Sequence, residues 1–261
     1  MSRQVPTLTY RGRRTWGATV RRWPGGKWLT RIVVTTRSLV SPVKAATLRL
    51  ERSARGELLQ PATNTWTDRH PLLFAATASH LDDVARPRLL SFGCSTGQEV
   101  FTLMRHLPSA QIDAVDINPA CIARARRDAR RRPDRAAINF ACASSPDPTR
   151  EASYDAVLCL SVLRHGRLEA ELPESCDDIM PFERFAATIN QLDRALRPGG
   201  LLVLWGCHFR FADTVVARRY RVLSVPAVRP QAAPFYGPDN SRLTVRSYVD
   251  FLFQKMSEAS D

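Results

Sequence analysis

Two glycines and one acidic residue have the spacing of a nucleoside-binding site. Gly93 and Gly97 stand in the run Phe92–Glu99, FGCSTGQE, directly after a short apolar segment, and Asp116 comes 19 residues after Gly97. Glycine lets the backbone approach a ligand closely, and a carboxylate at this distance can accept both hydroxyls of a ribose. No Lys follows Gly97, and the run is not G-x-G-x-x-G, so no phosphate cradle is expected. The pattern therefore predicts a nucleoside ligand.

The elements that must position these residues alternate between strands and helices. Helical patterns cover His70–Val84 and Phe182–Leu196 and also start at Gln98 and near Pro119. Short apolar runs predict strands at Arg88–Phe92, Gln111–Asp116, Ala137–Cys142, Tyr154–Leu160, Leu201–Gly206, Tyr220–Val225 and Tyr248–Phe253. Such alternation is typical of a parallel sheet covered by helices on both faces. We therefore expect a doubly wound, Rossmann-like α/β fold.

Three sequence features together resemble a known family. They are the string GCSTGQE at residues 93–99, the strand end at Asp116, and LRPGGLLV at residues 196–203. Together they resemble class I S-adenosylmethionine-dependent methyltransferases over roughly residues 60–206, and the CSTGxE form is most similar to the chemotaxis-receptor methyltransferases. The resemblance implies S-adenosyl-L-methionine as cofactor and a methyl acceptor that is a small molecule or a protein. It also implies a seven-stranded, mostly parallel sheet with an antiparallel last strand.

The resemblance assigns cofactor-binding roles to particular residues. Glu99 would meet the ammonium group of the cofactor, Asp116 would hold the ribose, and Ile117 would lie against adenine. A Thr-x-x-x-Arg element before the first strand contacts the cofactor in that family, and Thr65 to Arg69 has this form here. The other positions that the resemblance places at the cofactor are Thr63, Gly93, Cys94, Ser95, Thr96, Gly97, Ser144, Leu160 and Ser161.

Three of these positions depart from the family pattern. Ser144 stands where an Asp or Asn is common, and a hydroxyl is a weaker acceptor than a carboxylate. Leu160 and Ser161 stand where the chemotaxis-receptor enzymes carry Arg-Asn. The likeness therefore concerns the cofactor more than the acceptor.

Candidate catalytic residues follow from position alone. A general base is needed only if the methyl acceptor must lose a proton, because the displacement itself depends on positioning. His165 follows the fourth predicted strand, His208 follows the fifth, and Tyr236 lies in a later Pro-rich loop where it could cap the pocket. We expect these three residues to be the best-placed catalytic candidates.

The basic charge is concentrated near the start of the chain. The net charge is +13, and residues 1–60 hold 13 Lys and Arg but only 2 acidic residues. We expect residues 1–60 to form a basic, partly helical extension, with a helix from Trp28 interrupted at Pro42, and residues 61–261 to form the methyltransferase domain. The extension could contact RNA or, through Trp23 and Trp28, an anionic membrane. Its Arg-rich composition also fits an organelle transit peptide.

Two further charged segments leave alternatives open. Arg124–Arg135 holds seven Arg and two Asp and is either a solvated helix face or an RNA-binding patch. The acidic segment Glu169–Glu183 either binds a cationic substrate or offsets the basic extension. An RNA-directed methyltransferase and a non-catalytic cofactor-binding protein are therefore alternative functions.

Cysteine and histidine usage indicates the compartment and the absence of a metal. The six Cys show no C-x-x-C spacing, and the five His are scattered, so neither a disulfide framework nor a metal site is expected. No apolar run is long enough for a membrane-spanning helix. We expect a cytoplasmic protein.

Overall fold

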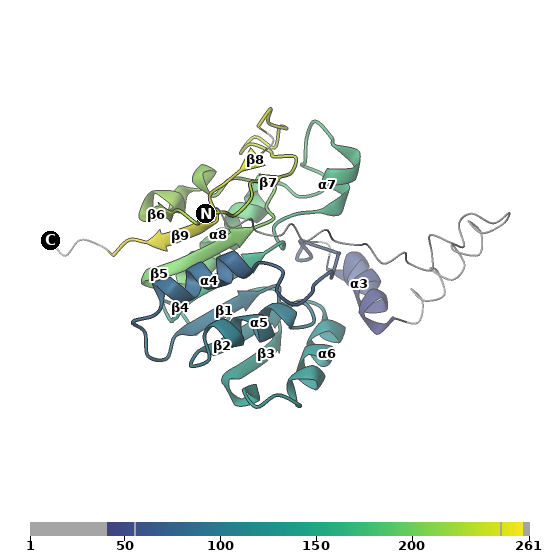
Figure 1. Ribbon diagram of the computed structural model, residues 1–261. Helices are drawn as coiled ribbons and strands as arrows, with labels where there is room; N and C mark the ends of the chain where they lie inside the picture. The colour runs from purple at the N-terminus through teal and green to yellow at the C-terminus, as the bar shows by residue number, and fades with distance from the viewer. Residues whose placement is uncertain (1–40, 55, 246, 258–261) are drawn as a thin grey trace, which may run out of the picture. The chain divides into compact units, whose positions relative to one another are not determined.

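The expected seven-stranded sheet is present in the computed structural model, which describes residues 41–54, 56–245 and 247–257 (Figure 1). The strand order is β3-β2-β1-β4-β5-β9-β6, and a separate two-stranded sheet joins β7 to β8. The bounds are β1 Arg88–Phe92, β2 Gln111–Asp116, β3 Ile138–Cys142, β4 Tyr154–Leu160, β5 Leu196–Trp205, β6 Tyr220–Leu223, β7 Gln231–Ala232, β8 Ser247–Tyr248 and β9 Leu252–Lys255. Strands β1 to β5 pair in parallel, and β9 is antiparallel to both of its neighbours, β5 and β6. The Rossmann-like fold with an antiparallel last strand is confirmed.

Helices cover both faces of the sheet, as the apolar strands require. The α-helices are α3 Pro42–Ser53, α4 Pro71–His80, α5 Gln98–His106, α6 Pro119–Ala129, α7 Gly166–Glu171 and α8 Phe182–Ala195, and short 3₁₀ turns occupy η1 Arg135–Ala137, η2 Phe211–Asp213 and η3 Val215–Arg219. Helices α4, α5 and α6 share one core layer, whereas α8 packs in the other. No helix among the described residues combines the length and the apolar character needed to cross a bilayer.

Strand β4 shows why the sheet needs helices on both faces. All seven of its residues are buried. Val157 and Cys159 pack in the layer of α8, and Leu158 packs in the layer of α4, α5 and α6. Because successive side chains of a strand point to opposite faces, a strand that is apolar at every position must be buried on both sides.

Three elements differ from the sequence-based expectations. The predicted strand Tyr248–Phe253 serves two sheets, because Tyr248 belongs to β8 whereas the pairing with β5 begins only at Leu252. The short helix α7 overlaps the start of the acidic segment, and its six residues are too few to show a helical period. Helix α3 begins at Pro42, since proline is well tolerated in a first turn. The predicted helical stretch between Trp28 and residue 40 lies outside the described residues.

The parallel register brings three strand ends to one edge of the sheet. Phe92, the last residue of β1, lies opposite Val115 of β2 and Cys159 of β4. The loops after these strands therefore start side by side. In open α/β sheets this carboxyl edge is where ligands bind.

Candidate functional site

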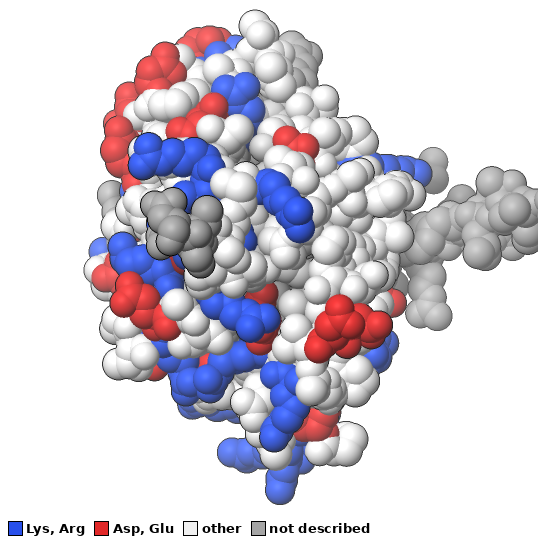
Figure 2. Space-filling model, turned by 90° about the vertical axis from the view of Figure 1, so that its left-hand side faces the viewer, with Lys and Arg blue, Asp and Glu red and all other residues white. Residues whose placement is uncertain are grey.

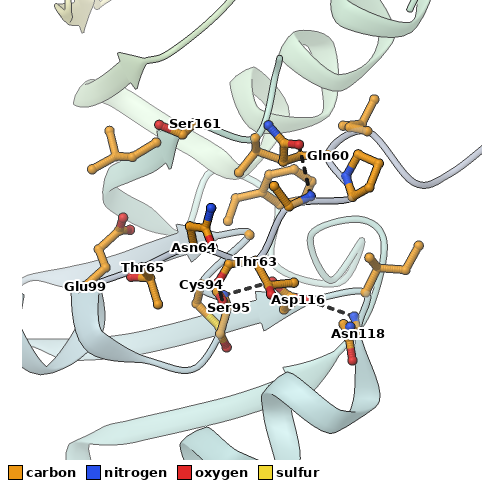
Figure 3. Close-up of a pocket in the computed structure, with 18 of the residues that line it drawn as sticks. Gln60, Thr63, Asn64, Thr65, Cys94, Ser95, Glu99, Asp116, Asn118 and Ser161 are labelled. Carbon is orange, nitrogen blue, oxygen red and sulfur yellow. Dashed lines mark hydrogen bonds between the residues drawn. The ribbon is translucent and has the colours of Figure 1, made fainter. Parts of the chain in front are cut away.

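A cavity opens at this carboxyl edge of the sheet, and its lining includes the loops after β1, β2, β3 and β4 and the stretch that precedes α4. Including its mouth, it holds about 940 Å³ of space, within the range of small-molecule sites. The loops after β1, β2 and β4 form one side, and the stretch from residue 57 to residue 66 forms another. In the view of Figure 3, Glu99 and Ser161 lie toward one end of the cavity, and Asp116 and Asn118 lie toward the other.

Asp116 is held in place by the backbone of two loops. Its Oδ2 accepts a hydrogen bond from the Ser95 N–H at 2.8 Å, and its Oδ1 accepts one from the Asn118 N–H at 2.8 Å. Burial raises the pKa of Asp116, while these two backbone hydrogen bonds lower it. Each carboxylate oxygen has a second lone pair. The side chain is thus oriented and still able to accept two hydroxyl groups.

The turn after β1 needs a glycine at its first position. Gly93 has a φ of 76°, and a Cβ there would come within 2.2 Å of Val162 Cγ2. The Gly93 and Cys94 N–H groups both donate to the Val115 carbonyl, at 2.8 and 2.9 Å. Ser95 also has a positive φ, 50°, and its Oγ donates to the Thr63 carbonyl at 3.0 Å. The turn is therefore tied both to β2 and to the stretch that precedes α4.

Opposite charges meet at the Glu99 end of the cavity. Glu99 accepts a hydrogen bond from Ser91 Oγ at 2.9 Å. Burial raises its pKa to about 7, against the Ser91 hydrogen bond and the positive charge of Arg69, which both lower it. Arg69 donates to Ser161 Oγ at 3.1 Å and to the Asn64 carbonyl at 3.0 Å, and its guanidinium lies 4.5 Å from the ring centre of Trp66. This end can therefore receive a group that carries both charges.

Most residues that the resemblance assigned to the cofactor do line this cavity. They are Thr63, Thr65, Arg69, Gly93, Cys94, Ser95, Glu99, Asp116, Ile117, Ser144, Leu160 and Ser161. Thr96 and Gly97 do not line it. Thr96 is buried and donates to Gln98 Oε1, and Gly97 begins α5 with a φ of 88° and a Cβ position 3.1 Å from Ala125. These two residues shape the turn instead.

None of the three catalytic candidates lines the cavity. Both ring nitrogens of the fully buried His208 face carbonyl oxygens, with Nδ1 2.9 Å from Pro234 and Nε2 3.2 Å from His165, and burial lowers its pKa to about 4. Tyr236 is also fully buried and donates its hydroxyl hydrogen to the Pro173 carbonyl at 3.1 Å, so it does not cap the pocket. His165 lines a second cavity that adjoins the first.

Sequence reasoning missed one part of the wall and one anchor. Leu58, Leu59, Gln60 and Pro61 line the cavity, although they precede or mark the expected domain boundary. Neither the hydrophobic periodicity nor the composition of this stretch indicates that it lines a site. Asn118 could have been found, because it has the residue type and position of a helix N-cap: its side chain accepts from two N–H groups of α6.

Some of the side chains in the two charged segments are paired within the described residues. In the acidic segment, Glu169 pairs with Arg164, Glu171 with Arg167, and Glu174 with Arg242. In the arginine run, Arg124 pairs with Asp128, Arg132 with Asp134, and Arg126 binds the Phe140 carbonyl. Figure 2 shows basic and acidic side chains interspersed on one face, with more basic ones toward its lower edge. RNA or membrane contact through residues 1–60 falls mostly outside the described residues.

Comparison with known families finds a match to the central part of the chain. Residues 90–202 match the model of a methyltransferase domain. This range begins in β1 and ends in β5, so it contains the glycine turn, Glu99, Asp116 and Ser161. The match supports methyl transfer. Among the described residues, no group of three or more His, Cys, Asp or Glu side chains could hold a metal ion.

Individual relatives share only part of their length with this chain. An uncharacterized protein of Synechococcus sp. is 30% identical over 106 residues, which are 40% of this chain and 25% of that protein. Among solved structures, the [4+2]-cyclase SpnF is 26% identical with a TM-score of 0.37, over 51% of this chain and 43% of that one. The plantazolicin methyltransferase BpumL in complex with SAH is 16% identical with a TM-score of 0.38, over 66% of this chain and 61% of that one.

The lack of space for a Cβ at Gly93 predicts that a larger residue there destabilises the protein. We expect Gly93→Ala to lower the free energy of unfolding in urea by about 1–3 kcal/mol, from a strained positive φ and a clash with Val162. The double variant Gly93→Ala/Val162→Ala should show coupling, because the second change removes the atoms that clash. Gly166→Ala is the matched control, since no atom lies within 4 Å of its Cβ position. A Gly93→Ala protein as stable as wild type would contradict the turn geometry.

Proposed function

We propose that this protein is an S-adenosyl-L-methionine-dependent methyltransferase, with the cavity as its cofactor site. Bound there, the cofactor would supply an electrophilic methyl group: the acceptor nucleophile bonds to the methyl carbon as the carbon–sulfur bond breaks, and S-adenosylhomocysteine leaves. The observation that carries the proposal is that the two ends of one cavity suit two different chemical groups. Asp116 offers free lone pairs that suit two ribose hydroxyls, and Glu99 with Arg69 offers opposite charges that suit an amino-acid group. A nucleoside linked to an amino acid satisfies both ends.

Each end has a defined task in this proposal. Asp116 accepts the two ribose hydroxyls while the Ser95 and Asn118 amides keep its carboxylate oriented. Glu99 pairs with the ammonium group, and Arg69 pairs with the carboxylate of the same amino-acid moiety. Ile117 and the exposed Ser144 line the part of the cavity near Asp116 and would face adenine. The resemblance to the chemotaxis-receptor enzymes is proposed for this cofactor motif alone.

The acceptor is proposed to be a small molecule or a protein side chain. No described histidine lines the cofactor cavity, so the chain's main contribution to the reaction would be to orient the cofactor and exclude water. An acceptor that already carries a lone pair needs no general base. Of the three catalytic candidates, His165 is the one that lines the adjoining cavity.

The ribose assignment predicts a loss of affinity when Asp116 is changed. Titration calorimetry should show that wild type binds S-adenosylmethionine and S-adenosylhomocysteine, and that Asp116→Ala binds both at least tenfold more weakly. The reason is that each hydrogen bond to a charged acceptor contributes about 1.5–3 kcal/mol.

Two further variants make this result specific. Asp116→Asn keeps one acceptor oxygen and should lose less affinity than Asp116→Ala. Asp113→Asn, on the same strand but outside the cavity, should bind both ligands like wild type. If wild type bound neither ligand, the proposed function would fail, and if Asp116→Ala bound like wild type, only the ribose assignment would fail.

The raised pKa of Glu99 predicts a pH dependence of cofactor binding. Because this pKa is about 7, Glu99 is mostly protonated at pH 6 and mostly ionised at pH 7.5, and only the ionised form attracts an ammonium group. Affinity for S-adenosylhomocysteine should therefore rise about eightfold between these two pH values. Glu99→Gln should flatten the profile. A wild-type profile that was flat, or that fell with rising pH, would rule out Glu99 as the partner of the ammonium group.

A further inference from the structure

A second cavity adjoins the cofactor cavity across the stretch from Leu58 to Pro61. Leu58 and Pro61 line both cavities, so one short segment of chain forms their common wall. Five other lining residues have ionisable side chains, namely Glu51, His165, Arg167, Asp178 and Arg184. A ligand held in the second cavity would therefore lie next to the cofactor.

Arg184 is the arginine of this cavity that forms no ion pair among the described residues. It lies on α8, and its Nη2 donates to the Leu58 carbonyl at 3.2 Å, which ties it to the common wall. Its Nε is buried and has no hydrogen-bond partner among the described residues. Arg184 also forms no ion pair with a described carboxylate, and burial alone lowers its pKa. A buried donor without a partner, on a guanidinium that forms no ion pair, is costly unless a ligand satisfies it.

The neighbouring groups indicate which ligand would satisfy Arg184. Arg167 is already paired with both carboxylate oxygens of Glu171, at 2.8 and 3.1 Å. His165 accepts the Arg167 N–H through Nδ1, so its neutral ring carries the hydrogen on Nε2 and offers one more donor. Glu51 and Asp178 also line the cavity and would repel a doubly charged anion. A group with one negative charge and two acceptor oxygens fits best.

We propose that the second cavity is the acceptor subsite and that Arg184 binds a carboxylate group of the methyl acceptor there. The inference rests on the proposed function, because it assigns the cofactor to the adjoining cavity. It adds a substrate class: a carboxylate-bearing acceptor, anchored by Arg184 and His165, whose reacting atom lies toward the common wall. A planar guanidinium is well suited to this task because its donors match the two oxygens of a carboxylate.

The test uses the full chain, with propionate as the carboxylate probe and propionamide as its uncharged analogue. Proton–nitrogen NMR spectra follow the Arg184 Nε–H signal, assigned by its absence in Arg184→Gln and Arg184→Lys. Propionate should shift this signal saturably, and propionamide should leave it in place. Saturation transfer to propionate should fall at least fivefold in Arg184→Gln. It should be unchanged in Arg194→Gln, which alters an exposed arginine of the same helix outside the cavity.

Three results would overturn the proposal. The Arg184 signal could stay in place with propionate, Arg184→Gln could bind propionate like Arg194→Gln, or inorganic phosphate could shift the signal at a lower concentration than propionate does. Each titration is made with and without S-adenosylhomocysteine, and calorimetry measures binding of that ligand to each variant. Failure of wild type to bind S-adenosylhomocysteine counts against the proposed function, whereas these three results count against the carboxylate subsite.

Discussion

The site depends on one carboxylate that joins two loops. Asp116 ends β2 and accepts one N–H from the turn after β1 and another from the start of α6. Both loops must therefore pass close to the end of β2, and the turn after β1 also approaches the loop after β4. This crowding is why Gly93 has a positive φ and no space for a Cβ beside Val162. The same crowding leaves the cavity bounded on one side by backbone and small side chains.

The cavity differs electrostatically between its two ends: burial raises the pKa of both acidic residues, but different groups oppose it at each end. At one end, backbone N–H groups already bind the Asp116 carboxylate. At the other, Glu99 is partly protonated near neutral pH, because its burial outweighs the effects of Ser91 and Arg69. A nearby histidine, His70, shows the same influence, since burial lowers its pKa to about 4. Burial thus favours the uncharged forms of Glu99 and His70.

The sequence predicts the sheet and the cofactor motif because both depend on local patterns. The apolar run of β4 requires burial on both faces, and the spacing from Gly97 to Asp116 spans one helix and one strand. The wall from Leu58 to Pro61 could not be predicted, because its position depends on contacts with α8 that no local pattern encodes. The same holds for Tyr236, which is buried and donates a hydrogen bond to the carbonyl of the distant Pro173. The predicted strand Tyr248–Phe253 is divided between two sheets in the structure, because Tyr248 pairs with β7 and not with β5.

A crystal structure of the protein with S-adenosylhomocysteine is the most direct test of the proposed cofactor site. The predicted result has both ribose hydroxyls within hydrogen-bond distance of Asp116, the ammonium group beside Glu99, and the amino-acid carboxylate beside Arg69. Binding outside the cavity would contradict this assignment. So would binding in the reverse orientation, with adenine beside Glu99 and the amino-acid end beside Asp116.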